Sequence, residues 1–372
     1  MGAVRGHKVL PEEFSHDKQV ASSKLRPGSE RRLSKAPVRL ADVATKAGVS
    51  AGTVSNVLNH PHKVSDDTAK KVRTVIEELG FVRDANASSL ASGRSSYIGL
   101  SAINLGNSLF LDAARGAGAY CRERSLSVLM ADSADDYAQQ TASVEYFNEA
   151  RVAGLLLAPM HDSSAQIKSL MDRGCPVVLM NYDPGHLGVC SAIIDNYQVG
   201  KLIAQHALEL DAKHIAFVYS LEDVQPVKER RRGIQDVIRE AGAGVIYEEI
   251  YTVDVNEGSG RETARQLISR TEGKRPDAVI SVTDALAAGL IEELCDAGIS
   301  VPGQIKVMGC DDNVLAADCR MTITTVRMHG YEMGKAAAEM LIDEILSGET
   351  HKHSQVVLQP ELWVRMSSEE RM

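Results

Sequence analysis

The first regular pattern along the chain is a pair of short amphipathic helices. Apolar residues at helical spacing predict one helix over residues 40–47, and Gly48 breaks that pattern. Ser50 can cap a second helix over residues 51–59, whose apolar residues line a single face. The spacing therefore predicts two short helices joined by a tight turn.

A third helix completes a small domain. Ser65 can cap a helix that runs to Leu79, and Gly80 follows it as a stop signal. The apolar stripes of the three helices can close one core. Residues 1–36, in contrast, show neither a helical nor a strand period, and Pro27 to Ser29 interrupt them, so we expect a mobile extension there.

Beyond residue 97 the chain alternates short apolar runs with amphipathic helices. The predicted elements are strand 98–102, helix 111–124, strand 127–131, helix 138–150, strand 154–158, helix 165–172, strands 177–180 and 191–194, helix 198–210, strand 214–219, helices 229–241 and 258–269, strand 278–281, helix 284–297 and strand 306–310. Such alternation is typical of parallel sheets covered by helices on both faces. This part of the chain is too long for one ordinary open sheet, so we expect two lobes. A ligand cleft would lie between them, at the carboxyl ends of the strands.

The charge of the chain is unevenly distributed. The net charge is -9, yet residues 1–94 carry 16 Lys and Arg against 10 Asp and Glu, whereas the remaining 278 residues carry 25 against 40. A basic N-terminal quarter favours contact with a polyanion, and the acidic remainder favours a different role. A solvated basic tail is the alternative, because residues 1–36 alone contribute a balance of +4.

Several classes of protein are disfavoured by what the chain lacks. The longest apolar run, residues 152–160, has nine residues, whereas a membrane helix needs roughly 18 to 20. The N-terminal residues lack the apolar stretch of a secretory signal, so we expect a cytoplasmic protein with no membrane partner. The six cysteines form no C-x-x-C pair, which favours buried thiols over disulfides or a structural zinc site.

No catalytic motif stands out. The chain contains no Walker-type loop, no G-x-S-x-G and no H-E-x-x-H. Two histidine pairs, His60 with His62 and His351 with His353, have a spacing that can ligate a metal ion. Exposed pairs in loops usually do not bind metal, so we expect neither a metal nor a cofactor. The sequence predicts a binding protein, not an enzyme.

The predicted helix pair has the geometry that lays its second helix in the major groove of DNA. Ser50 and the helix N-terminus can donate to a phosphate. Thr53, Ser55 and Asn56 carry short polar side chains suited to phosphate oxygens and base edges. In an ordinary helical hairpin the same side chains would only face solvent, and the spacing alone leaves both interpretations open.

Residues 38–100 resemble the lactose and galactose repressor (LacI/GalR) family of bacterial transcription regulators. The segments that carry the resemblance are Leu40–Ser50, Thr53–Asn59, Val64–Ser65, Thr68, Val72, Leu79–Phe81, Ser89–Ala91, Gly93–Ser95 and Ile98–Leu100. The resemblance implies a hinge helix over Asn86–Ser92 that folds on DNA when a dimer docks, so Asn86 is an expected DNA contact. It also implies that Leu90 enters a minor-groove step and kinks the duplex. Lys63 can reach a phosphate.

The chain departs from the family pattern in two places. Ala51 and Gly52 stand where the family often has larger or polar residues, so base readout should rest on the remainder of that helix and on the hinge. Arg83-Asp84 replaces the usual Pro-Asn before the hinge. This replacement leaves open how the hinge is held in the free protein.

The resemblance extends over about nine-tenths of the chain and implies a two-lobed core like that of the periplasmic sugar-binding proteins. The supporting segments are Val152–Leu155, Ile194–Asn196, Gly200, Arg230, Gly233, Thr283–Gly289, Gly309–Asp312 and Thr322–Val326. In the cleft we expect five effector-binding residues: Phe110, Asn181, Tyr182, Arg230 and Asp284. Arg230 can donate to sugar or carboxylate oxygens, Asp284 can accept from hydroxyl groups, and Phe110 matches a family position that stacks on the ligand.

Each of these residues has a structural alternative. Asp284 can simply cap its helix, and Phe110 can belong to the core. Arg230 can pair with Glu222 or Glu229. The identity of the effector stays open, with a nucleobase or another metabolite as the alternative to a sugar.

These observations predict an α/β protein in which a three-helix, helix-turn-helix domain and a hinge helix precede a two-lobed core of parallel sheets. The expected parts are a mobile extension (1–36), a helix-turn-helix domain (37–84), a hinge and linker (85–96), and a core (97–372) whose first lobe holds 97–195 and 324–355 and whose second holds 196–323 and 356–372. We expect a homodimeric repressor of transcription that binds near-palindromic double-stranded DNA under the control of a sugar-like effector. The alternative is a cytoplasmic sugar-binding protein or enzyme with the same core, and residues 38–94 argue against it.

Overall fold

The computed structural model describes residues 38–82, 95–220, 224–317 and 321–369. The chain divides into two compact units, residues 1–93 and residues 94–372. The predicted extension over 1–36 and the predicted hinge helix over 86–92 lie outside the described residues.

The first unit is a three-helix domain with a small core of its own. Its elements are α1 (Leu40–Ala47), α2 (Ala51–Asn59), the 3₁₀ turn η1 (Pro61–Lys63) and α3 (Asp66–Leu79). Gly48 and Gly80 end α1 and α3 in the left-handed conformation, with φ of +66° and +63°, which suits a residue without a Cβ atom. Valine and alanine side chains from all three helices form the core, and the three predicted helices are confirmed.

The first lobe of the second unit is a six-stranded parallel sheet in the order β11-β5-β4-β3-β1-β2. Its elements are β1 (Tyr97–Ala102), α5 (Ser108–Arg122), β2 (Ser127–Asp132), α6 (Tyr137–Glu149), β3 (Leu155–Leu157), α7 (Ser164–Met171), β4 (Val177–Met180), β5 (Cys190–Ile194), α13 (Gly330–Ser347), η3 (Gly348–Thr350) and β11 (Gln355–Leu358). Helix α13 lies against β3, β4 and β5 and packs on α5. The central strands are almost fully buried, as expected for a sheet covered on both faces.

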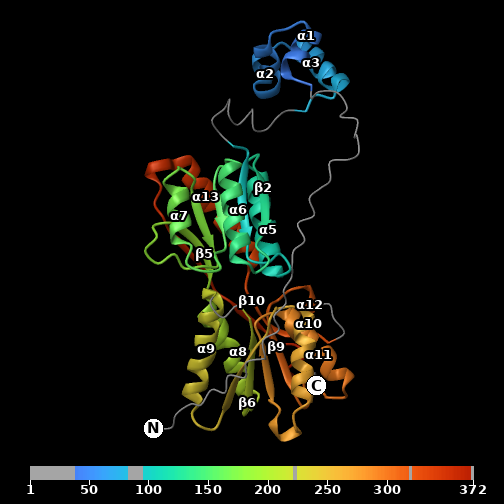
Figure 1. Ribbon diagram of the computed structural model, residues 1–372, viewed down its shortest axis with the longest axis vertical. Helices are drawn as coiled ribbons and strands as arrows, with labels where there is room; N and C mark the ends of the chain where they lie inside the picture. The colour runs from blue at the N-terminus through green and yellow to red at the C-terminus, as the bar shows by residue number, and fades with distance from the viewer. Residues whose placement is uncertain (1–37, 83–94, 221–223, 318–320, 370–372) are drawn as a thin grey trace, which may run out of the picture. The chain divides into compact units, whose positions relative to one another are not determined.

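The second lobe is a sheet in the order β12-β10-β9-β8-β6-β7, in which only the β10–β12 pair is antiparallel. Its elements are α8 (Asn196–Glu209), β6 (His214–Tyr219), α9 (Gln225–Ala241), β7 (Ile246–Tyr251), α10 (Glu257–Ile268), η2 (Glu272–Lys274), β8 (Ala278–Ser281), α11 (Asp284–Asp296), β9 (Lys306–Asp311), α12 (Val314–Ala317), β10 (Thr324–Arg327) and β12 (Glu361–Trp363). Helices α8 and α9 cover one side of the sheet, and α10 and α11 cover the other (Figure 1). None of the helices in the described part of the chain combines the length and the apolar character that crossing a membrane requires.

The chain crosses between the lobes at places that differ partly from expectation. The first crossing, between β5 and α8, lies at the expected position. The expected return at residue 324 is corrected, because β10 pairs with β9 and β12 and so belongs to the second sheet. The return therefore follows Arg327, and the last crossing follows Leu358 at the end of β11.

Helix pairs in the core approach closely where glycines face each other. A Cβ atom on Gly200 in α8 would lie 2.0 Å from the backbone oxygen of Arg230, and one on Gly233 in α9 would lie 2.2 Å from that of Tyr197. Glycine therefore sets the spacing of these two helices, since any larger residue would push them apart. This spacing matters for the site because α9 carries Arg230 and α8 begins at Asn196.

Candidate functional site

The start of α2 is fixed by its own N-cap. The Ser50 hydroxyl oxygen accepts a hydrogen bond of 3.0 Å from the Thr53 backbone N–H and lies 2.9 Å from the Thr53 hydroxyl. This capping arrangement holds the first turn in place and leaves the amides of Ala51 and Gly52 pointing out of the helix. A helix N-terminus of this kind favours a phosphate.

Two of the polar residues predicted on α2, Ser55 and Asn56, lie on the side of the helix away from the core. Val54 and Val57 are buried in the core of the domain, whereas Ser55 and Asn56 lie roughly opposite them and are half-buried. Thr53 is also half-buried and is tied to Ser50, so its hydroxyl serves the cap in the free protein. The polar side chains that α2 presents on this side are short, and their contact with base edges stays a prediction.

The other predicted DNA contacts fall in two groups. Ser50 and Lys63 are exposed, Ser50 at the first turn of α2 and Lys63 at the end of η1, which follows it. Asn86 and Leu90 lie outside the described residues.

The second unit holds a cavity of about 50 Å³ that is lined by both lobes. Its polar lining residues are Asn104, Asn107, Asp135, Asn181, Ser220, Arg230 and Thr283. Most of them follow the carboxyl ends of strands β1, β2, β4, β6 and β8, which is where ligands of parallel α/β sheets bind. A cavity of this volume holds a few water molecules, so a larger ligand requires the lobes to separate.

Arg230 lies at the centre of a buried hydrogen-bond chain that joins the lobes. Its Nε atom donates to Asn196 Oδ1 over 2.8 Å, and one terminal nitrogen donates to the carbonyl of Val282 over 2.9 Å. Asn196 in turn donates to Asn181 Oδ1, at the end of β4 in the first lobe, over 2.8 Å. The second terminal nitrogen of Arg230 has no acceptor among the residues that the structure describes. This nitrogen can donate to a ligand oxygen.

Asp135 supplies an unsatisfied acceptor on the opposite wall. Its Oδ2 atom accepts a hydrogen bond from the side-chain amide of Asn104, whereas its Oδ1 atom is buried without a hydrogen-bond partner among the described residues. Burial raises the pKa of the Asp135 carboxyl, and the Asp254 carboxylate of the second lobe raises it further. A buried acceptor without a hydrogen bond destabilises the fold, and a ligand hydroxyl that donates to Oδ1 would remove this destabilisation.

An apolar patch faces these polar groups. The Phe110 ring, buried near the start of α5, lines the cavity together with Val224 and Val227 of the second lobe. Asn107 caps α5 by accepting a hydrogen bond from the Leu109 N–H over 2.9 Å. The cavity therefore combines amides, hydroxyls, one guanidinium and one carboxylate with an aromatic ring.

Two of the five predicted effector residues lie outside the cavity lining. Asp284 is fully buried, its Oδ1 accepts a hydrogen bond from the Thr325 hydroxyl over 2.6 Å, and its Oδ2 accepts from the Asn313 N–H over 3.0 Å. Burial raises the pKa of Asp284 to about 7. Tyr182 is half-buried and packs with a separate apolar cluster of the first lobe. Phe110, Asn181 and Arg230 are the three that the structure brings together.

The prediction missed polar residues that surround this site. Asn104, Asn107 and Asp135 lie in loops after β1 and β2, while Ser220 and Thr283 follow β6 and β8. Their position directly after predicted strands was the available signal. Single polar residues in loops are too common for that signal to have singled them out.

Comparison with known proteins gives matches to both units. The model of the bacterial regulatory proteins, lacI family, matches residues 39–84, and that of the periplasmic binding protein-like domain matches residues 204–368. The ribose operon repressor of Escherichia coli (strain K12) is 31% identical over 307 residues, covering 82% of this chain and 92% of its own length. The HTH-type transcriptional repressor PurR of Aliivibrio fischeri (strain MJ11) is 29% identical over 328 residues, which cover 88% of this chain and 97% of that repressor. The solved structure of a complex between the transcriptional regulator CelR and cellobiose superposes with a TM-score of 0.65 at 27% identity. The match covers 89% of this chain and 99% of the CelR chain.

Proposed function

Because this chain belongs to the lacI family of bacterial regulatory proteins, we propose that α2 reads operator DNA and that the cavity around Arg230 binds a sugar-like effector. Family membership makes the protein a DNA-binding repressor of transcription under small-molecule control. The proposal adds the residues that carry out each task, and it includes no catalytic role, since the relatives named above are regulators.

The DNA-reading part of the proposal rests on the first turn of α2. The Ser50 cap orders this turn in the free protein, and Ser55 and Asn56 lie on the side that does not pack on the core. Asn56 is the contact that specifies sequence, because an amide can pair with the edge of an adenine. Ser50, Thr53 and Lys63 position the helix on phosphates. A homodimer would present two such helices to a near-palindromic site in the bacterial cytoplasm, with Asn86 and Leu90 acting at its centre.

The effector part of the proposal rests on the buried Oδ1 atom of Asp135, for which the described residues supply no hydrogen-bond donor. This buried acceptor and the second terminal nitrogen of Arg230 are both available to one ligand between the lobes. A polyhydroxyl compound satisfies both, since each hydroxyl donates one hydrogen bond and accepts others. The amides around them can pair with further hydroxyls, and Phe110 offers a face for the apolar side of a sugar ring. CelR, whose structure was solved with cellobiose, has the same fold.

Effector binding would affect DNA binding through the contacts that hold the two lobes together. Besides the Asn181–Asn196 hydrogen bond, the Gln225 side chain of the second lobe accepts from the Asp183 N–H over 2.6 Å and donates to the Asp183 carbonyl over 3.3 Å. A ligand that binds the open and closed arrangements with different affinity shifts the balance between them, and it can change operator affinity by no more than that difference.

Ligand-dependent thermal unfolding of the full chain tests the effector. Monosaccharides, disaccharides and purines are added one at a time, and we expect a carbohydrate to raise the unfolding temperature of the wild type. The same compound should have little effect on Asp135→Asn or Arg230→Ala. A purine that stabilises the protein, with carbohydrates inactive, would overturn the sugar assignment and leave the DNA assignment standing.

A further inference from the structure

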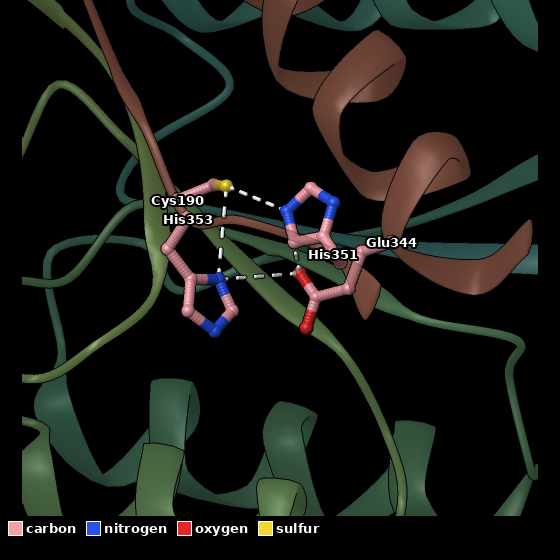
Figure 2. A group of neighbouring side chains, drawn as sticks. All are labelled: Cys190, Glu344, His351 and His353. Atoms are coloured by element: carbon pink, nitrogen blue, oxygen red, sulfur yellow. Dashed lines mark hydrogen bonds and ion pairs between the residues drawn. The ribbon is translucent and has the colours of Figure 1, made fainter. Parts of the chain in front are cut away.

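Four side chains with metal-binding atoms converge at the end of the first lobe, away from the cavity. Cys190 is the first residue of β5, Glu344 is on α13, and His351 and His353 lie between η3 and β11. Figure 2 shows the thiol, both imidazoles and the carboxylate directed at one another. Their four ligand atoms all lie within 4.8 Å of one another.

Hydrogen bonds join Cys190 to both imidazoles, whereas the distances from the imidazoles to the carboxylate are too long for hydrogen bonds and suit neighbouring ligands of one ion. The Cys190 Sγ atom lies 3.1 Å from His351 Nε2 and 3.8 Å from His353 Nδ1. Both of these imidazole nitrogens lie 3.9 Å from Glu344 Oε2, too far for a hydrogen bond. In a tetrahedral zinc site the bond lengths place neighbouring ligand atoms about 3.3 to 3.6 Å apart. Small movements of the side chains reach that geometry.

One oxygen atom of the cluster has no hydrogen-bond partner among the residues that the structure describes. Glu344 Oε2 is buried and accepts no hydrogen bond from the described residues. The His351 side chain is only 6% exposed, which corrects the expectation of an exposed pair for this histidine, whereas His353 is exposed as expected. A divalent cation would give Glu344 Oε2 the partner that the described residues do not supply, and metal binding favours the charged forms of thiol and carboxyl ligands.

The groups around the cluster orient the ligands as in known metal sites. The Asp343 Oδ2 atom lies 2.8 Å from His351 Nδ1, so the carboxylate holds the proton on Nδ1 and leaves Nε2 free to bind a metal. The backbone N–H of Ser354 donates to Cys190 Sγ over 3.3 Å, which favours the thiolate. These two contacts come from residues that are not themselves ligands.

We propose that Cys190, Glu344, His351 and His353 bind one divalent transition-metal ion, with zinc as the expected occupant. Sulfur and imidazole nitrogen are preferred zinc ligands, and four protein ligands leave no open position for a substrate. The site is therefore structural. It would join α13 and the start of β11 to the start of β5, at the opposite end of these strands from the cavity.

Metal content of the untagged full-length protein tests the proposal. After equilibration with zinc and removal of the excess, we expect one zinc ion per wild-type chain and a loss to background in Cys190→Ser and in His351→Ala. Matched controls are Cys295→Ser and His62→Ala, because Cys295 and the His60–His62 pair lie outside the cluster. Both controls should keep the zinc. A wild type without zinc, or zinc retained by both cluster variants, would overturn the proposal.

Two further measurements separate metal binding from misfolding. Co²⁺ in place of zinc should give the visible bands of a tetrahedral site and a thiolate-to-cobalt charge-transfer band in the wild type, with the latter lost in Cys190→Ser. Asp343→Asn keeps all four ligands, and we expect it to weaken zinc binding about 10- to 100-fold while the circular dichroism of the metal-free protein stays unchanged. Unchanged affinity in Asp343→Asn together with an octahedral cobalt spectrum in the wild type would contradict the assigned geometry.

Discussion

Arg230 donates a 2.8 Å hydrogen bond from Nε to the side-chain oxygen of Asn196, and both residues are more than nine-tenths buried. The Asn196 side-chain amide in turn donates a hydrogen bond to Asn181 in the other lobe. A guanidinium buried in this way holds a fixed orientation, because its planar group is bound on two sides. Under the proposed function, this fixed orientation directs the remaining nitrogen to a ligand that lies between the lobes.

Arg230→Lys should weaken effector binding strongly. A lysine cannot keep the bonds to Asn196 and Val282 and also donate to the ligand in the same plane. The loss of a charged hydrogen bond, about 1.5 to 3 kcal/mol, corresponds to a roughly 10- to 100-fold rise in Kd. Isothermal titration with the compound found by thermal unfolding measures it. The control is Arg232→Lys. Arg232 lies two residues further along α9 and pairs with Glu229 at the surface, so this variant should bind the compound as the wild type does. Equal losses in the two variants would show that general charge, not the Arg230 geometry, is responsible.

Ser50→Ala should loosen the start of α2. Removing the side-chain acceptor of the Thr53 N–H costs about 1 kcal/mol of local stability. We expect hydrogen exchange in the segment around residues 50–59 to become about fivefold faster, as measured by mass spectrometry on the full chain. Ser65→Ala is the matched control, because the Ser65 side chain bonds the Thr68 hydroxyl and does not cap a backbone N–H. Its effect on α3 should be small.

Gly233→Ala should destabilise the core and disturb the cavity. The added methyl would lie 2.2 Å from the Tyr197 carbonyl, so α8 and α9 must separate. Overpacking of this kind costs about 1 to 3 kcal/mol. Urea unfolding followed by the fluorescence of Trp363, the single tryptophan, reports on this unit alone. Gly118→Ala in α5 has open space around it and should be neutral or stabilising. A Gly233→Ala protein as stable as Gly118→Ala would refute the close crossing.

The stability of the core should fall as pH rises towards neutrality. Burial raises the pKa of Asp284 to about 7, whereas the unfolded chain releases this proton near pH 4. The folded state therefore binds more protons between about pH 4 and pH 7, and the free energy of unfolding decreases across that window. Asp311 acts in the same direction, since burial and the neighbouring Asp284 also raise its pKa. Asp284→Asn should reduce the difference in urea midpoint between pH 5 and pH 8, and an unchanged difference would show that other groups cause it.

The sequence predicts a helix or strand well when the residues that fix its ends and its buried face all lie within that element. Helix α2 has a cap and an apolar stripe within nine residues, so its bounds were predicted as the structure has them. Strand β7 was missed because Glu248 and Glu249 interrupt its apolar pattern. In the fold Glu248 pairs with Arg270, which lies two residues after α10, and Glu249 pairs with Arg231 of α9. No local pattern shows these pairs.

The same holds for the candidate sites: contacts between segments far apart in the sequence could not be predicted. Arg230 was predicted with the support of the family resemblance and Asn181 from its position after a strand, and both line the cavity. Asp284 was predicted on the same grounds, but Thr325 and Asn313, from distant segments, occupy both of its oxygens. The Cys190 cluster could not be predicted, because Cys190 and His351 are 161 residues apart and meet only when β11 pairs with β5.

Selection of binding sites from genomic DNA by the purified full chain tests the central claim most directly. We expect enrichment of one near-palindromic sequence by the wild type and by Ser65→Ala. Asn56→Ala should lose specificity at one position in each half-site, because the contact to a base edge is gone while the phosphate contacts remain. No enriched sequence with the wild type, or an identical sequence selected by Asn56→Ala, would contradict the assignment of α2 as the DNA-reading helix.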